Sequence, residues 1–251
     1  MSSIATDDGK TVHQQGGVSL IINKKWAPHI RESGSDTLGR WAWATMGGSG
    51  NKKITVVSAY QPCTGYVTDG CETVWRQQYD VITKKALQSG DGVVGKLDPR
   101  ERMLADLEKF IEMKKKAGHR VVLLIDANET RQVTGSAKKT YGSSMIQLEM
   151  DSSQDDDEVM VPSRIGGKRV IDHVDTYGIP KEYMRRAGQV PHGLGFESDH
   201  RGIYVDLEIE PLLGFQAKDY PAREQRRLKS KNKVLNAVQT SSRTVPAMCT
   251  M

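Results

Sequence analysis

The sequence is poor in cysteine and has no long apolar run. Its three cysteines (Cys63, Cys71 and Cys249) form no Cys-x-x-Cys pair and have no histidine at ligand spacing, which argues against structural zinc. A Cys63–Cys71 disulfide is conceivable, although reduced thiols are favoured. No apolar run approaches the roughly 18 residues that span a bilayer, and the polar N-terminus lacks a signal-peptide core. We therefore expect an intracellular protein without a membrane partner, and the sequence does not distinguish nucleus from cytoplasm.

Motifs for nucleotide cofactors are also missing. The sequence has neither a Gly-x-Gly-x-x-Gly motif nor a P-loop, which excludes the common nucleotide-cofactor folds. Hydrophobic residues make up 37% of the 251 residues and the mean hydropathy is −0.53. These values are typical of a water-soluble chain whose core forms one sizeable domain or two small ones.

The positive charge is concentrated at the C-terminal end. The net charge of the chain is +5. From Pro211 onward there are eight lysines and arginines and two acidic residues, whereas the preceding residues carry 28 basic and 29 acidic side chains. The high isoelectric point therefore reflects a tail, which weakens any inference of nucleic-acid binding from the overall charge.

Apolar patterns predict a mixture of strands and helices. The predicted strands are 16–25, 39–46, 53–60, 120–126, 169–178 and the second part of 198–207, and the first three form a meander with a turn at 47–51. The predicted helices are 73–88 and a second one that Asp98 caps and Gly118 ends. Residues 129–168 are loop-rich with an acidic middle, 180–195 are irregular, and 223–238 form a short tail helix. This order of elements indicates an α/β fold with a mixed sheet.

Polar side chains stand where several of the predicted strands begin or end. Tyr60 ends one strand, Asp126 and Asn128 follow the buried run 121–125, and Asp172 and His200 belong to later strands. Taken singly, each position is more typical of a packed tyrosine, a turn residue or a cap than of a catalytic residue. Taken together, they supply carboxylates, an amide, a phenol and an imidazole.

This set of groups suits phosphoryl chemistry. Hard oxygen ligands favour Mg²⁺ or Mn²⁺ over zinc. A carboxylate-oriented histidine and an asparagine stabilise developing charge on a phosphoryl group. Because no serine or cysteine nucleophile is paired with a base, direct attack by water is the natural reaction. The residues therefore predict a phosphodiesterase or a phosphatase.

The chain resembles the endonuclease/exonuclease/phosphatase superfamily, in particular its AP-endonuclease-like and retrotransposon-type members. The resemblance covers about residues 16–209 and depends on five motifs in order. They are Gly-Gly-Val-Ser-Leu (16–20), Ser-Ala-Tyr-Gln-Pro (58–62), Ile-Asp-Ala-Asn (125–128), Val-Ile-Asp-His-Val (170–174) and Ser-Asp-His-Arg (198–201). It implies a four-layer α/β sandwich of two mixed sheets flanked by helices.

The resemblance also implies roles for the polar residues. Tyr60 resembles the tyrosine that contacts the scissile phosphate, and Asp126 resembles the aspartate that orients or deprotonates the attacking water. Asn128 resembles the phosphate-binding asparagine. Asp172 and His200 look like the aspartate–histidine pair that stabilises the pentacovalent phosphate.

Asp199 resembles an acidic residue on the metal side of such a site, with Mg²⁺ or Mn²⁺ as the implied ion. His173 lies where aromatic residues are also common in the family, so it receives no catalytic role. DNA is the implied partner, and the oligomeric state is not predicted.

One departure from the family pattern bears on activity. Family members begin with a strand that ends in Asn and a second strand that ends in Gln-Glu, whose glutamate binds the metal, and both precede the Gly-Gly strand. This chain has only fifteen residues there, so it looks like a family domain without its first core strands. The expected division is a disordered N-terminus (1–15), the endonuclease-like domain (16–210) and a basic C-terminal tail (211–251).

Three functions are therefore open on the sequence. The first is a metal-dependent phosphodiester hydrolase, impaired by the loss of the Asn and Glu motifs. The second is a non-catalytic nucleic-acid-binding remnant of a mobile element, which would use the basic tail. The third is a phosphatase of the same superfamily.

Overall fold

A computed structural model describes residues 17–63, 73–89, 98–130, 146–147, 161–194 and 198–215. All of them fall within the first of two units of the chain, Met1–Ala217. The strands are β1 (Ile30–Ser35), β2 (Trp41–Gly47), β3 (Lys53–Tyr60), β4 (Arg120–Asp126), β5 (Ile146–Gln147), β6 (Asp172–Tyr177), β7 (Met184–Gln189) and β8 (Ile203–Leu207). The helices are α1 (Val74–Ser89), α2 (Pro99–Lys116) and α3 (Ile209–Leu213), with 3-10 turns at Ala27–His29, Ser49–Asn51 and Lys181–Tyr183.

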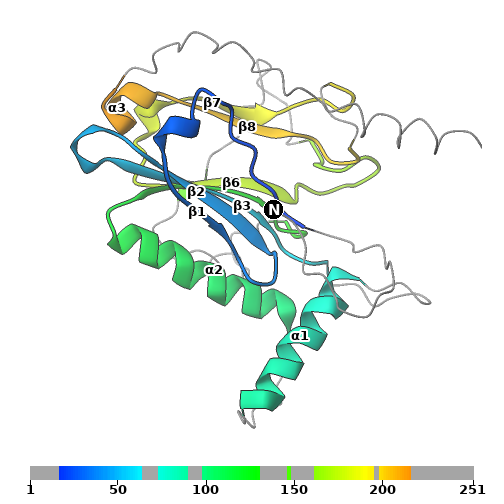
Figure 1. Cartoon of the computed structure of the whole chain (residues 1–251). Coiled ribbons are helices and arrows are strands. Elements are labelled where there is room, and N and C mark those ends of the chain that lie inside the picture. Colours follow the sequence, from blue (N-terminus) through cyan, green and yellow to red (C-terminus); the bar gives the residue numbers. More distant parts are fainter. Residues whose placement is uncertain are drawn as a thin grey trace, which may run out of the picture. The chain divides into compact units, whose positions relative to one another are not determined.

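Six of the strands form one mixed sheet in the order β1-β2-β3-β4-β6-β5. The first three form an antiparallel meander, and β3 and β4 are parallel neighbours connected through α1 and α2. β6 returns antiparallel to β4. A separate ribbon of β7 and β8 lies on one side of this sheet and α2 lies on the other (Figure 1).

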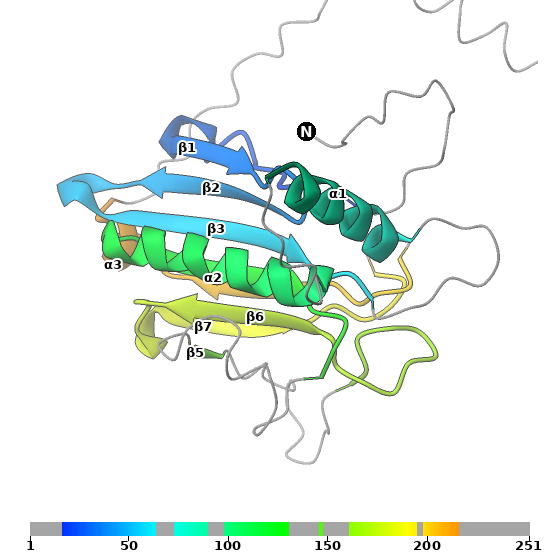
Figure 2. The ribbon, with the colours of Figure 1, turned by 90° about the horizontal axis from the view of Figure 1, so that it is seen from below.

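The helix-side core lies between α2 and the six-stranded sheet, and α2 runs along the strands (Figure 2). Alternate residues of β3 and β4 pack against the apolar stripe of α2, as the strand and helix periods require. The fully buried members of this core are Val57, Met103, Leu107, Ile111, Val121 and Leu123.

The ribbon-side core lies between the same sheet and the β7–β8 ribbon. It contains the other face of β4 and β6, represented by Val122 and Val174, together with Ala187 of β7. Leu212 and Leu213 of α3 are fully buried in this core. These two residues, which the expected division assigns to the tail, thus pack as part of the folded unit.

Helix α2 begins and ends as its sequence predicts. The Asp98 side chain accepts a hydrogen bond from the Arg100 N–H at 2.9 Å, and Pro99 occupies the first turn. Lys114, Lys115 and Lys116 lie in the last turn, where cations suit the helix dipole. Gly118 follows with a φ of 76° and directs the chain into β4.

Two parts of the predicted strand pattern are wrong. Residues 17–23 form no regular structure, and Ile21 is 93% exposed, because the sheet edge beside β2 is occupied by β1. The sequence of β1 is mostly polar, so its strand character comes from pairing with β2. Residues 184–189, expected to be irregular, form β7 by pairing with β8.

The α/β fold class with a mixed sheet is confirmed. Within the described residues there are three layers, formed by the helices α1 and α2, the six-stranded sheet and the β7–β8 ribbon. The expected N-terminal segment 1–15, most of the acidic loop and the tail helix 223–238 lie outside the described residues. The two-residue strand β5 was not predicted.

Candidate active site

Three polar side chains form a row across the neighbouring strands β3, β4 and β6. Tyr60 pairs with Asp126 in the parallel ladder, and Asp126 pairs with Asp172 in the antiparallel ladder. Partners on adjacent strands project from the same face, and the strands lie about 4.8 Å apart. Leu124 and Val174, two positions away from the aspartates, pack in the ribbon-side core. The row therefore faces the β7–β8 ribbon.

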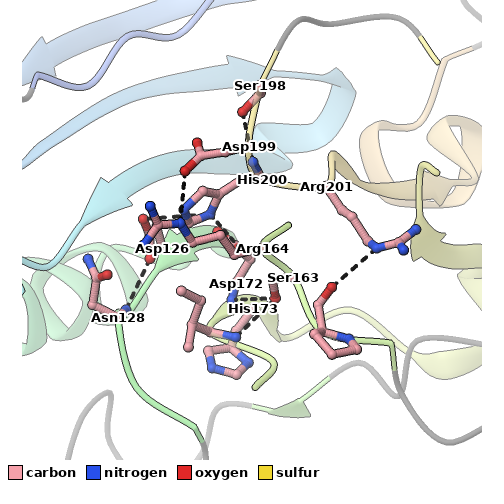
Figure 3. A network of polar contacts seen from close by, with 12 residues as sticks. Asp126, Asn128, Ser163, Arg164, Asp172, His173, Ser198, Asp199, His200 and Arg201 are labelled. Carbon is pink, nitrogen blue, oxygen red and sulfur yellow. Dashed lines mark hydrogen bonds and ion pairs between the residues drawn. The ribbon is translucent and has the colours of Figure 1, made fainter. Parts of the chain in front are cut away.

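His200 reaches this row from the segment that leads into β8. Its Nδ1 atom lies 3.0 Å from Asp172 Oδ2 and 4.0 Å from Asp126 Oδ2. A carboxylate accepts a hydrogen bond, so the contact with Asp172 favours the tautomer that carries its proton on Nδ1. Nε2 then remains available, with no partner in the described part of the chain. Figure 3 shows both aspartates beside the imidazole.

Ser163 holds the His200 segment against the start of β6. Its hydroxyl accepts hydrogen bonds from the N–H groups of Ile171 at 3.0 Å and Asp172 at 3.2 Å. Its carbonyl accepts a bond from the Arg201 N–H at 2.6 Å, and the residue is fully buried. One serine thus fixes both partners of the Asp172–His200 pair.

Asn128 joins the end of β4 to the end of β3. It adopts a left-handed conformation (φ 51°), which asparagine tolerates, and its N–H donates to Asp126 Oδ1 at 3.0 Å. Its Nδ2 donates to the Gln61 carbonyl at 2.7 Å, and its Oδ1 accepts from the exposed Cys63 thiol at 3.0 Å. The Tyr60 hydroxyl interacts with the same thiol and amide.

Arg100 ties the same two strand ends to helix α2. Its guanidinium donates to the carbonyls of Pro62 and Ala127, and it forms an ion pair with Glu129 at 2.8 Å. The side chain is only 7% exposed. The backbone that carries Tyr60 and Asp126 is therefore fixed by a buried arginine.

Burial governs the electrostatics of the two aspartates. Burial, followed by the negative charge of Asp172, raises the pKa of Asp126 to about 6 from its usual 3.8. Burial also raises the pKa of Asp172, and the attraction of His200 opposes that rise. Two carboxylates that lie this close together away from solvent are costly unless a cation or a proton lies between them.

Tyr60 stays a phenol at neutral pH. Burial, followed by the Cys63 thiol, raises its pKa to about 12. A neutral hydroxyl donates a hydrogen bond, whereas a phenolate would repel an anionic substrate. Its position beside Asp126 and Asn128 therefore provides a donor at the site.

The structure brings together Tyr60, Asp126, Asn128, Asp172 and His200. Asp199 is 58% exposed and forms an ion pair with Arg164 at 2.8 Å, which lowers the pKa of Asp199. Its predicted role at a metal stays a prediction. His173 points to the opposite face of β6, where its Nε2 contacts the Glu129 carbonyl at 3.0 Å.

The two aspartates and the histidine could hold one cation. Among the described residues, Asp126, Asp172 and His200 each offer a ligand atom, and these atoms lie within 4.8 Å of one another. Two carboxylates with water as further ligands suit Mg²⁺, and the imidazole also suits Mn²⁺. A cation there would also relieve the repulsion that raises the pKa of Asp126. The residues therefore fit a divalent metal, whose identity they do not fix.

Comparisons with known proteins give a distant likeness at the level of structure alone. No family model matches the chain, and no curated protein matches it. Among solved structures, the chain is similar to the endonuclease domain of TRAS1, a telomere-specific non-LTR retrotransposon. The identity is 13% and the TM-score is 0.34, over 70% of this chain and 68% of that chain. A likeness this distant says nothing about the chemistry of the chain.

Proposed function

We propose that this chain is a metal-dependent phosphodiester hydrolase that acts on DNA in the manner of an endonuclease. The observation that carries the proposal is the convergence of Asp126, Asp172 and His200, from three separate segments, within 4.8 Å. Tyr60 and Asn128 border the same point. Carboxylates, an imidazole and neutral donors around one point are what the hydrolysis of a phosphodiester by water requires.

Asp126 is the proposed general base. In the metal-free chain its pKa is raised to about 6, so Asp126 is a better proton acceptor than an ordinary aspartate and is still ionised at neutral pH. It takes a proton from the attacking water as the new P–O bond forms. The bond to the leaving oxygen then breaks, and that oxygen acquires a proton from solvent.

The other residues stabilise charge on the phosphoryl group. With a proton on both ring nitrogens, His200, held by Asp172, would donate its Nε2–H to a phosphoryl oxygen, and the Tyr60 hydroxyl would donate a second hydrogen bond. The backbone N–H of Asn128 donates to the Asp126 carboxylate. The side-chain amide of Asn128 donates to the Gln61 carbonyl, just after the end of β3. A divalent ion held by Asp126 and Asp172 would neutralise part of the phosphoryl charge.

Nicking of supercoiled DNA by the purified chain tests the proposal. We expect cleavage with Mg²⁺ or Mn²⁺ and none with EDTA. Asp126→Asn and His200→Ala should each lower the rate by about 10²- to 10⁴-fold, because each removes a proton-transfer or charge-stabilising group. Asp206→Asn, an exposed charge change on β8, serves as the matched control and should leave the rate unchanged.

Two results would count against the proposal. Cleavage that persists in Asp126→Asn and His200→Ala would come from a contaminating nuclease. Binding of DNA without metal-dependent cleavage by the unsubstituted chain would indicate a non-catalytic binding protein instead.

A further inference from the structure

The candidate site is rich in carboxylates, and a phosphodiester is an anion. Asp126, Asp172 and Asp199 all lie near His200. Three carboxylates repel an anionic substrate unless cations oppose them. A fixed cation at the site would reduce this repulsion in addition to any metal ion.

The buried Arg100 does not supply this cation. Its guanidinium already donates to two backbone carbonyls and to Glu129, and it is 7% exposed. Its hydrogen-bonding groups thus serve the backbone beneath the site. A substrate cannot reach it without breaking these bonds.

Arg164 has the opposite character. An antiparallel bridge fixes its backbone beside His200. Two hydrogen bonds flank this bridge: the Ile165 N–H donates to the Asp199 carbonyl (2.7 Å), and the Arg201 N–H donates to the Ser163 carbonyl (2.6 Å). The Arg164 side chain is 60% exposed. It is therefore a solvent-accessible cation on a rigid backbone.

The guanidinium of Arg164 is held at one end and open at the other. Its Nε donates to Asp199 Oδ2 at 2.8 Å, while Nη1 and Nη2 have no partner among the described residues. Figure 3 shows the side chain beside the His200 ring. A guanidinium presents a planar fork of donors that matches two oxygens of a phosphate.

We propose that Arg164 binds the two non-bridging oxygens of the substrate phosphodiester through its Nη groups, and that Asp199 positions it. This inference rests on the proposed hydrolase function for the identity of the anion. It gives Asp199 a role through Arg164, in place of the expected role as a metal-side acid. Arg164 is thus a substrate-binding residue and Asp199 a positioning residue.

The test measures anion binding separately from catalysis. Binding of inorganic phosphate to the full chain is measured by calorimetry in EDTA, and hydrolysis of bis(4-nitrophenyl) phosphate is measured with Mn²⁺. Arg164→Ala should weaken phosphate binding by about 10- to 100-fold and raise KM for the diester. Arg164→Lys keeps the charge but not the fork, so it should recover only part of the binding.

The matched control is Arg185→Ala. Arg185 forms an equally short ion pair with Glu208 (2.8 Å) and is 71% exposed, but it lies at the end of the β7–β8 ribbon remote from His200. Its loss should leave phosphate binding and KM unchanged. Because exposed ion pairs add little to folding stability, neither arginine variant should lower the Tm appreciably.

Asp199→Asn separates the two roles of the aspartate. Loss of the Asp199 charge would by itself strengthen anion binding, so weaker phosphate binding in EDTA, where no metal is bound, would report the loss of Arg164 positioning. Unchanged phosphate binding in EDTA would overturn the positioning role.

The failure of this inference and the failure of the proposed function give different results. Unchanged phosphate binding and KM in Arg164→Ala, with hydrolysis that still depends on Asp126, would overturn the role of Arg164 and leave the hydrolase standing. Phosphate binding that depends on Arg164, in a chain without hydrolysis, would support the anion site and overturn the hydrolase.

Discussion

At the scale of single residues, Asp126 combines a functional position with a cost in stability. The folded-state pKa of about 6 lies above the usual 3.8, so the folded chain holds this proton more tightly than the unfolded chain. The free energy of unfolding therefore falls as pH rises from about 4 to about 6, and it stays lower above that range. A charged Asp126 thus destabilises the fold at neutral pH in the absence of metal.

Asp126→Asn should therefore stabilise the metal-free chain at pH 7. We expect a gain of about 1–3 kcal/mol in the free energy of unfolding at pH 7, and almost none at pH 4. The asparagine carbonyl can still accept the Asn128 N–H. Urea denaturation in EDTA at both pH values measures the difference.

Asp206→Asn removes the same charge from an exposed position and isolates the effect of burial. A loss of stability in Asp126→Asn at pH 7 would mean that the carboxylate is stabilised by its neighbours rather than strained by burial.

The central site residues could be predicted because they terminate strands. Tyr60, Asp126 and Asp172 follow or begin apolar runs, and their shared register across β3, β4 and β6 brings them into one row. The apolar run predicts where the strand lies, and the polar residue next to the run marks the end of that strand. Periodicity therefore predicts the strands, and the polar residues mark where they end.

The supporting residues could not be predicted in this way. Ser163 and Arg164 lie in a loop without periodicity, and only the fold brings them to His200. Arg100 sits in the first turn of a helix, where an arginine is ordinarily solvated, and its burial depends on the backbone of two distant strand ends. Interactions between distant segments leave no signal in a single sequence.

At the scale of elements, the N-terminus of α2 connects the two helices. Asp98 Oδ1 accepts bonds from the Arg100 N–H at 2.9 Å and from the Trp75 indole N–H of α1 at 3.2 Å. The sequence predicts the cap, but it does not predict the indole contact. One carboxylate thus caps one helix and holds the other.

Asp98→Ala should lower the free energy of unfolding by about 1–2 kcal/mol, since both the cap and the indole bond disappear. Asp98→Asn retains an acceptor oxygen for either bond and should lose much less. Urea denaturation monitored by circular dichroism compares the two variants. Equal losses in both would show that the charge of Asp98, rather than its hydrogen bonds, stabilises this helix end.

Strand prediction failed where pairing outweighs local preference. β1 and β7 contain few β-branched residues, yet each pairs antiparallel with a neighbour that has a clear strand pattern. Residues 17–23 have the better local pattern and no partner strand among the described residues. A sheet edge accepts one partner, and sequence periodicity does not say which segment it is.

At the scale of the whole molecule, the β4–β6 pair belongs to both cores. One face of β4 packs against α2 and the other packs against the β7–β8 ribbon. None of the described helices is both long and apolar enough to cross a membrane. The site lies at one end of the doubly packed strands, so its geometry depends on both cores at once.

The charge of the tail gives a prediction about DNA retention. Residues from 211 onward carry eight basic and two acidic side chains, whereas the rest of the chain is nearly neutral. Replacing Lys229, Lys231 and Lys233 by glutamine in the full chain should weaken DNA binding and make it less sensitive to salt. For every phosphate that the tail no longer neutralises, the slope of log K against log salt should fall in magnitude by about 0.9. Fluorescence anisotropy over a salt series measures both effects.

Three exposed helix lysines, Lys84, Lys85 and Lys109, provide the matched control, because their replacement removes the same charge from the folded domain. The tail variant should retain the hydrolysis of bis(4-nitrophenyl) phosphate, since that small diester needs only the residues around His200. An equal loss of salt sensitivity in both variants would mean that DNA binding follows the total charge, with no special role for the tail. A loss confined to the tail variant would assign nucleic-acid retention to the tail and phosphodiester chemistry to the folded unit.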